Sequence, residues 1–263
     1  MKRFLDDFFA NFLQNKDNFV ISADVGYFPN ARKMHNYIDI GNCESTAGSL
    51  IDGLLSAGKN VCLYDICGYV FRNSYSSFID MQSRYKKNRG VLTVFGWGSG
   101  FAYDGCLHGH YPFDDIILAK LFGLKVYEPL TPESMYFSYF MKNGYIRLLN
   151  LDEYHMNASD LNICNGGFYL YADGWMYCEI NKFLKELSPD KSKKFTLWQM
   201  MNPDNIGESG GIYFSDQYYC EIIRPNNPQI QFSCPEIHDI YTSKDDFVQK
   251  IIRKPILEAC SEI

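Results

Sequence analysis

The chain has 263 residues and a formal net charge of -6, and 46% of its residues are hydrophobic. This length is enough for one large domain or two modest ones, and we expect two, each with a buried core. With 25 basic against 31 acidic residues, and one short basic run over 84–89, the chain offers nucleic acid no electrostatic footprint. No apolar run approaches the roughly 20 residues that cross a bilayer, and acidic residues come too early for a signal peptide, so we expect a cytoplasmic protein.

The spacing of the nine cysteines and five histidines indicates neither a set of disulfide bonds nor a metal site. The cysteines are odd in number and scattered in spacing, and several lie in apolar runs such as 61–67, which favours reduced, buried thiols. No Cys-X-X-Cys pair occurs, and His108 and His110 alone have a spacing typical of ligands. We therefore expect no structural zinc site.

Helices and strands are predicted to alternate along the first part of the chain. Apolar residues recur at helical spacing over 1–16, and a short buried strand over 18–24 ends at an acid, Asp24. Further strands are predicted over 37–40, 60–66, 91–95, 125–128 and 145–148, and further helices over 44–57, 73–84, 113–121 and 132–143. This alternation predicts an α/β fold, with a parallel sheet flanked by helices on both faces.

A polar stretch over 149–165 is predicted to be a linker, after which the alternation begins again. Strands are expected over 168–171, 195–200 and 218–223, and helices over 175–187 and 245–252. We therefore predict a boundary near residue 155, with one domain over 1–155 and a smaller α/β domain over 156–263.

Ligands of open α/β sheets bind beyond the carboxyl ends of the strands, so the loops after each strand are the informative positions. Taken in order, these loops resemble the pyrimidine-binding domain of transketolase and its thiamine-diphosphate-dependent relatives. The resemblance covers 18–150 and rests on five features in family order: Ser22-Ala-Asp24, the Glu44 helix with its glycines, Gly68 to Tyr75, Asp104-Gly-Cys-Leu-His108 and Tyr145-Ile-Arg-Leu148. The residues from about 166 onward resemble the C-terminal domain of that family.

The resemblance implies a role for Glu44, which opens the helix predicted over 44–57. In the family, a glutamate here hydrogen-bonds a ring nitrogen of the aminopyrimidine and favours its imino tautomer, so that the ring itself takes the proton from the thiazolium carbon. A carboxylate in a partly desolvated pocket binds such a nitrogen more strongly than in water. The alternative is a first-turn acid that the helix dipole favours by about 0.3 to 1 kcal/mol, without a catalytic role.

The three aromatic residues that follow the Glu44 helix have two interpretations each. Tyr69, Phe71 and Tyr75 are candidates for the wall that stacks on the pyrimidine, because flat rings gain from offset stacking, and ordinary core packing is the rival, above all for Phe71. Gly48 and Gly53 fit tight helix packing, expected at a subunit interface.

The resemblance also implies residues that contact substrate. Asp104 corresponds to an acid that binds hydroxyl groups of the donor sugar, and one of His108 and His110 is expected to face the substrate. Asp24 falls where the family has an acid near the cofactor and the subunit contact. Arg147 is expected to brace its strand rather than to touch substrate.

One family motif has no counterpart here. Thiamine diphosphate is held through Mg2+ by a Gly-Asp-Gly followed some 25 to 30 residues later by an Asn, and this chain lacks that pattern. The resemblance therefore implies half an enzyme, in which a second polypeptide holds the diphosphate and Mg2+. We expect an α2β2 assembly with the active site between chains.

The family's phosphate-gripping histidine and arginine are also missing, since Gly96 or Trp97 and Leu149 or Asn150 occupy those places. Each charge-assisted bond to a phosphate is worth about 1.5 to 3 kcal/mol. The substrate is therefore expected to lack a terminal phosphate, or to carry it elsewhere, as a nucleotide-linked sugar does.

These features predict the small, pyrimidine-binding subunit of a split transketolase-like enzyme that moves a two-carbon ketol unit between sugars. An alternative with the same cofactor is the beta subunit of a 2-oxo-acid dehydrogenase, or an enzyme similar to deoxyxylulose-phosphate synthase. Asp104 favours sugar chemistry, because oxo acids have no hydroxyl groups that need an acid there. A second alternative is a non-catalytic partner that retains the fold, against which the presence of Glu44 argues.

Overall fold

A computed structural model divides the chain into two compact units, Met1–Gly98 with Asp115–Leu148, and Ser99–Asp114 with Leu149–Ile263. The structure describes residues 2–84, 90–100, 102, 114–131, 134, 139, 144–149, 163–164, 166, 168–172, 174–199, 211–214, 230–233 and 243–262. The predicted boundary near residue 155 lies outside the described residues, so it stays a prediction.

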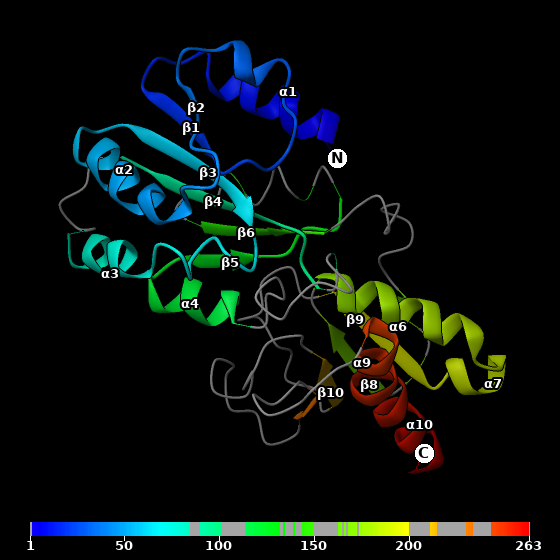
Figure 1. The fold of residues 1–263 in the computed structure, drawn as a ribbon. Coiled ribbons are helices and arrows are strands. Elements are labelled where there is room, and N and C mark those ends of the chain that lie inside the picture. The colour runs from blue at the N-terminus through cyan, green and yellow to red at the C-terminus, as the bar shows by residue number, and fades with distance from the viewer. Residues whose placement is uncertain are drawn as a thin grey trace. The chain divides into compact units, whose positions relative to one another are not determined.

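The first unit is built on a six-stranded, fully parallel sheet in the order β2-β1-β3-β4-β6-β5 (Figure 1). Its strands in chain order are β1 (Asn18–Ser22), β2 (Tyr37–Asp39), β3 (Asn60–Ile66), β4 (Leu92–Trp97), β5 (Lys125–Tyr127) and β6 (Gly144–Leu148). Each lies where a strand was predicted, within a few residues. The parallel α/β architecture is therefore confirmed.

The helices of the first unit connect these strands. They are α1 (Lys2–Phe12), the 3-10 turn η1 (Ala31–Lys33), α2 (Glu44–Ser56), α3 (Tyr75–Arg84) and α4 (Asp115–Leu121). The first helix ends four residues earlier than predicted, and most of the helix predicted over 132–143 lies outside the described residues. Because α2 and α3 follow parallel strands directly, each begins at the carboxyl edge of the sheet.

Helix α1 packs on one face of the sheet through aromatic rings. Phe9 lies edge-to-face with Phe95 of β4 at 5.4 Å between ring centroids, and with Tyr64 of β3 at 5.8 Å. Both side chains are fully buried in a cluster that also contains Ile146 and Leu148. Tyr64 and Phe95 thus define the α1 side of the sheet.

The opposite face of the sheet carries a second aromatic cluster. Phe71 packs against Phe78 of α3 and Tyr145 of β6, with centroids 5.2 and 4.9 Å apart, and Phe122 stacks on Phe78 at 5.1 Å. Side chains alternate along a strand, so residues next to Tyr64 and Phe95 point to this second face. That face is the one that α2, α3 and α4 cover.

The second unit has a smaller sheet, in the order β11-β10-β8-β9-β7, in which β7 alone is antiparallel. Its strands are β7 (Ile163–Cys164), β8 (Phe168–Ala172), β9 (Phe195–Gln199), β10 (Gly211–Phe214) and β11 (Ile230–Ser233). Its helices are α6 (Gly174–Glu186), α7 (Pro189–Ser192), α9 (Lys244–Phe247), the π-helical η5 (Val248–Arg253) and α10 (Lys254–Glu262).

Sequence patterns located β8, α6 and β9 correctly but missed β7, β10, β11, α7 and α10. The strand predicted over 218–223 lies outside the described residues. The predicted last helix is present as α9 and η5. No helix in the described part of the chain is long and apolar enough to span a bilayer.

Candidate functional site

Glu44 lies at the carboxyl edge of the first sheet, because it begins α2 directly after β2. Its side chain is partly exposed, and the N-cap residue Cys43 provides no side-chain hydrogen bond to the helix. The first turn of a helix carries unpaired N–H groups and a partial positive charge, which stabilise an ionised carboxylate. The fold therefore presents one carboxylate of α2 at the edge where ligands of such sheets bind.

The start of α2 is fastened to the segment that follows β3. The Ser74 hydroxyl donates a 2.5 Å hydrogen bond to the carbonyl of Glu44, and Ser74 itself is 2% exposed. One turn later Gly48 contacts α3 so closely that a Cβ at this position would come within 2.4 Å of the Ser77 Cβ. The backbone of Glu44 is thus held in place by packing within the chain.

Asp65 is a second carboxyl group at this edge. It is 2% exposed near the end of β3, and its Oδ1 accepts a 2.7 Å hydrogen bond from the N–H of Ile66. Burial raises the pKa of Asp65 to about 7, the hydrogen bond from Ile66 N–H opposes this increase, and the negative charge of Glu44 adds a still smaller increase. Sequence analysis did not single out this residue, although an acid inside the apolar run 61–67 was the available signal.

The three aromatic candidates differ in exposure. Tyr69 is half-buried just after β3, and Tyr75 is 43% exposed at the start of α3, with its ring edge-to-face with Phe122 at 5.6 Å. Phe71 is 1% exposed, and other aromatic rings cover it. Among the three, Tyr69 and Tyr75 are the residues that are not fully buried.

Asp24 follows β1 and is exposed at the same edge. Among the non-glycine residues that the structure describes, Asp24 alone has a positive φ angle, 51°. Its N–H donates to Asp39 Oδ1 at 3.3 Å, and Asp39 also pairs with Arg32 at 2.5 Å. The turn after β1 is therefore held to the end of β2 while the Asp24 side chain faces outward.

Arg147 of β6 lies in a buried ionic cluster with Asp115 and Glu128. Such a position is consistent with a residue that braces its strand. The Arg147 Nε donates to Asp115 Oδ2 at 2.8 Å and its Nη1 to Glu128 Oε1 at 2.7 Å, with all three side chains 1% exposed. The Tyr145 hydroxyl donates to the same Asp115 oxygen at 2.5 Å. Burial, and then the charge of Asp115, raises the pKa of Tyr145, which keeps the hydroxyl neutral.

The remaining substrate candidates, Asp104, His108 and His110, lie outside the described residues. Of the residues expected where the family has phosphate ligands, Gly96, the alternative to Trp97, lies against the Tyr145 hydroxyl and the Cys67 sulfur, where no larger side chain fits. Asn150, the alternative to Leu149, lies outside the described residues. Leu149 is 2% exposed. Neither Gly96 nor Leu149 offers a cationic group to a phosphate.

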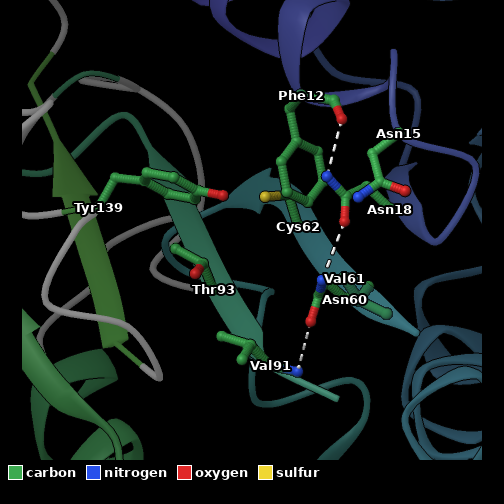
Figure 2. Close-up of a pocket in the computed structure, with 9 residues that line it drawn as sticks. All are labelled: Phe12, Asn15, Asn18, Asn60, Val61, Cys62, Val91, Thr93 and Tyr139. Atoms are coloured by element: carbon green, nitrogen blue, oxygen red, sulfur yellow. Dashed lines mark hydrogen bonds between the residues drawn. The ribbon is translucent and has the colours of Figure 1, made fainter. Parts of the chain in front are cut away.

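The pocket in Figure 2 lies at the opposite, amino-terminal edge of the first sheet and encloses about 210 Å3. A chain of hydrogen bonds forms its wall, from the Val91 N–H through Asn60 and Asn18 to the Phe12 carbonyl, at 3.1, 2.9 and 2.8 Å. Further lining residues are Asn15, Val61, Cys62, Thr93 and Tyr139.

The two titratable groups of this pocket are neutral near pH 7. Burial raises the pKa of the Cys62 thiol and, with a smaller effect of Cys62, that of the Tyr139 hydroxyl. The pocket therefore has no charge with which to pair a basic nitrogen or a phosphate. The carboxyl edge is the candidate site, and the described residues contain no group of three or more His, Cys, Asp or Glu that could hold a metal ion.

No protein-family profile matches the chain, and a search of curated proteins finds no match. Solved structures do match. One described as a split-gene transketolase, an inactive beta4 tetramer, aligns with a TM-score of 0.68 at 11% identity, over 99% of this chain and 96% of that chain. A transketolase from Pichia stipitis in complex with sedoheptulose-7-phosphate aligns with a TM-score of 0.65 at 10% identity.

The chain therefore has the transketolase fold. The chain spans 96% of the split-gene protein. It spans only 45% of each Pichia stipitis transketolase chain, one in complex with sedoheptulose-7-phosphate and one in complex with xylulose-5-phosphate. At 10 or 11% identity these likenesses establish the fold and leave the chemistry to the residues of the site.

Proposed function

We propose that the chain is the small, pyrimidine-binding subunit of a two-chain, thiamine-diphosphate-dependent transketolase that transfers a two-carbon ketol unit between sugars. In this proposal residues 1–155 form the pyrimidine-binding domain and 156–263 the C-terminal domain. The observation that carries it is the position of Glu44, a partly exposed carboxylate in the first turn of α2 at the ligand-binding edge of a transketolase fold.

The described residues fit the pyrimidine half of the cofactor. Glu44 would accept a hydrogen bond from the protonated ring nitrogen, and the half-buried Tyr69 or the exposed Tyr75 would stack on the ring. Phe71 is the weakest of the three aromatic candidates, because its ring is already covered by Phe78 and Tyr145. When bound, the cofactor supplies the nucleophilic carbon and the electron sink, and the chain supplies ring orientation and tautomer control.

We propose that a second polypeptide holds the other half of the cofactor. The sequence has no diphosphate-binding motif, and the chain covers 45% of the Pichia stipitis transketolase chains. The split-gene neighbour, of nearly equal extent, is described as inactive in a tetramer of one subunit type. We therefore place the diphosphate and Mg2+ in the partner subunit, within an α2β2 assembly.

The substrate is proposed to be a sugar without a terminal phosphate at the usual place, such as a nucleotide-linked sugar. Gly96 and Leu149 provide no cation for such a phosphate. Asp24, together with Asp104 and one of His108 and His110, would bind the hydroxyl groups of donor and acceptor. An exposed Asp24 at the carboxyl edge is consistent with that role.

Reconstitution tests the proposal. The chain is purified alone and with a diphosphate-domain subunit encoded beside it, and both preparations are assayed for cleavage of a panel of phosphorylated, free and nucleotide-linked ketoses. We expect cleavage only when both chains, thiamine diphosphate and Mg2+ are present. A stable assembly that cleaves no ketose, or full activity of the chain alone, would contradict the proposal.

A further inference from the structure

The strongest unassigned feature is the pocket at the amino-terminal edge of the first sheet (Figure 2). Its buried polar lining residues are Cys62 of β3 and Thr93 of β4, which are partners in the sheet register and are 1% and 3% exposed. Both lie on the face of the sheet that α1 covers. Phe12, the last residue of α1, and the exposed Asn15 complete the path to the surface, so the pocket opens where α1 ends.

Thr93 brings an unpaired hydroxyl group to this pocket. Within the described part of the chain, no hydrogen bond engages the Thr93 Oγ1, although the residue is 3% exposed. Figure 2 shows the Tyr139 hydroxyl pointing toward the Cys62 sulfur, with Thr93 beside them on β4. A buried hydroxyl without a partner is costly and uncommon, which is a reason to expect a bound molecule or ordered water next to it.

The asparagine side chains of the pocket have donors to spare but few acceptors. The side-chain oxygens of Asn15, Asn18 and Asn60 each accept a hydrogen bond from the protein, at 3.0, 2.9 and 3.1 Å. Asn18 and Asn60 each donate one amide N–H, and within the described part of the chain the Asn15 amide donates none. Because a carboxamide has two N–H donors, each of the three keeps at least one for a ligand or water.

The pocket is uncharged. None of the described residues that line it is an acid, a lysine, an arginine or a histidine, and burial keeps the Cys62 thiol and the Tyr139 hydroxyl protonated by raising the pKa of each. Asp17 and Lys59, next in sequence to Asn18 and Asn60, pair with each other at 2.7 Å. A charged ligand would therefore lose its hydration without gaining a counter-ion, so the pocket favours an uncharged one.

The size of the pocket limits the ligand to one ring. Its volume is about 210 Å3, whereas pockets for drug-sized molecules begin at about 300 Å3. Phe12 and Tyr139 lie edge-to-face with centroids 6.0 Å apart and provide aromatic surface for a flat ring. The space fits a single substituted ring and is too small for a dinucleotide.

We propose that this pocket binds a small uncharged ring that carries an amide carbonyl, such as a pyridine carboxamide or a pyrimidinone. The carbonyl oxygen accepts from the asparagine N–H groups and the Thr93 hydroxyl. A sugar of similar size fits less well, because each of its hydroxyl groups must also donate and the asparagine oxygens are already engaged. Glu44 lies at the opposite edge of the sheet, so this inference does not depend on the proposed function.

The first test titrates nicotinamide, an uncharged pyridine carboxamide, into the full chain labelled with nitrogen-15. We expect saturable NMR shifts centred on the backbone amides of Val61 and Thr93, with a dissociation constant of about 1 mM or tighter. Nicotinate, which has the same ring and a negative charge, and glucose should bind about tenfold more weakly or worse. No saturation below about 20 mM, equal binding of nicotinate or glucose, or shifts centred on Glu44 overturns the inference.

Thr93→Val removes the hydroxyl and keeps the shape of the side chain. We expect it to weaken nicotinamide binding about fivefold or more, the scale of one hydrogen bond. Because the hydroxyl has no partner in the described part of the chain, the variant should be at least as stable as the wild type in urea denaturation, so weaker binding cannot arise from unfolding. Unchanged binding, or a loss of stability, contradicts the assigned role of Thr93.

Asn15→Asp tests the donors at the rim of the pocket. Asp keeps the oxygen that accepts from the Asp17 N–H but has no N–H groups, so nicotinamide binding should weaken about fivefold. Asn11→Asp makes the same change of charge at an exposed position of α1 that does not line the pocket, and should bind nicotinamide as the wild type does. Equal effects of the two substitutions overturn the inference, because they would reflect charge alone.

Discussion

The Ser74 hydroxyl donates a 2.5 Å hydrogen bond to the backbone carbonyl of Glu44, and so joins the first turn of α2 to the segment after β3. We expect Ser74→Ala to destabilise the first unit by about 1 kcal/mol, the usual net value of a buried hydrogen bond. Urea denaturation measures this change. Ser76→Ala, at an exposed position two residues later in α3, is the control, and equal effects of both substitutions would contradict the assignment.

Arg147 is expected to be far more important for stability than a surface arginine. Arg147→Met leaves Asp115 and Glu128 buried without their cation, which costs about 3 to 5 kcal/mol. The ion pair of Arg32 with Asp39 is partly exposed, so Arg32→Met should cost less than about 1 kcal/mol. Denaturation of the two variants side by side distinguishes these values, and similar losses would show that the buried cluster does not brace the sheet.

The glycines of α2 should respond in opposite directions to alanine. Gly48→Ala places a Cβ where the Ser77 Cβ lies 2.4 Å away, so α2 and α3 must separate, at a cost of about 1 to 3 kcal/mol. A Cβ added at Gly53 would have no other atom within 4 Å. Gly53→Ala should therefore stabilise the helix by up to about 1 kcal/mol. Thermal melts of both variants provide the comparison. A stabilising Gly48→Ala would be incompatible with the close contact.

Asp65 should make the protein less stable as pH rises. Its folded pKa, about 7, lies above the ordinary value of 3.8, so between these values the unfolded chain binds fewer protons and unfolding becomes easier with increasing pH. Asp65→Asn removes this dependence. Relative to wild type, we expect the variant to gain about 2 to 3 kcal/mol between pH 5 and pH 8 in urea denaturation. An unchanged difference between the two proteins across this range would refute the burial of an uncompensated acid.

Much of the first unit could be predicted because its elements are locally specified. The strands β1, β3 and β4 are runs of apolar and β-branched residues bounded by polar ones, and α2 follows β2 after a short turn. The order of the strands within the sheet, by contrast, could not be predicted. β6 lies between β4 and β5 although it follows both in sequence, and nothing in the composition of these strands specifies that order. The short β10 and β11 likewise have too few residues for a clear pattern.

The sequence could predict which loops carry the candidate site, but not which side chains contact one another there. Glu44, Asp24 and the aromatic candidates follow strands, where parallel sheets bind ligands, so their edge could be inferred. Asp65 had only one signal, an acid inside the apolar run 61–67, because its significance depends on α2 packing over β3 beside it. The partners of Arg147 are also non-local, since Asp115 and Glu128 come from other elements. Sequence separation hides such juxtapositions even where each residue is conspicuous.

The most direct test of the account is the activity of Glu44→Gln in the assembled two-chain enzyme. Gln keeps the size of the side chain but cannot pair as an anion with a ring nitrogen, so ketose cleavage should fall about a hundredfold or more, the usual scale for losing acid-base assistance. Asp7→Asn, with the same change in charge on the exposed side of α1, should retain full activity. A Glu44→Gln enzyme as active as the wild type would contradict the central claim.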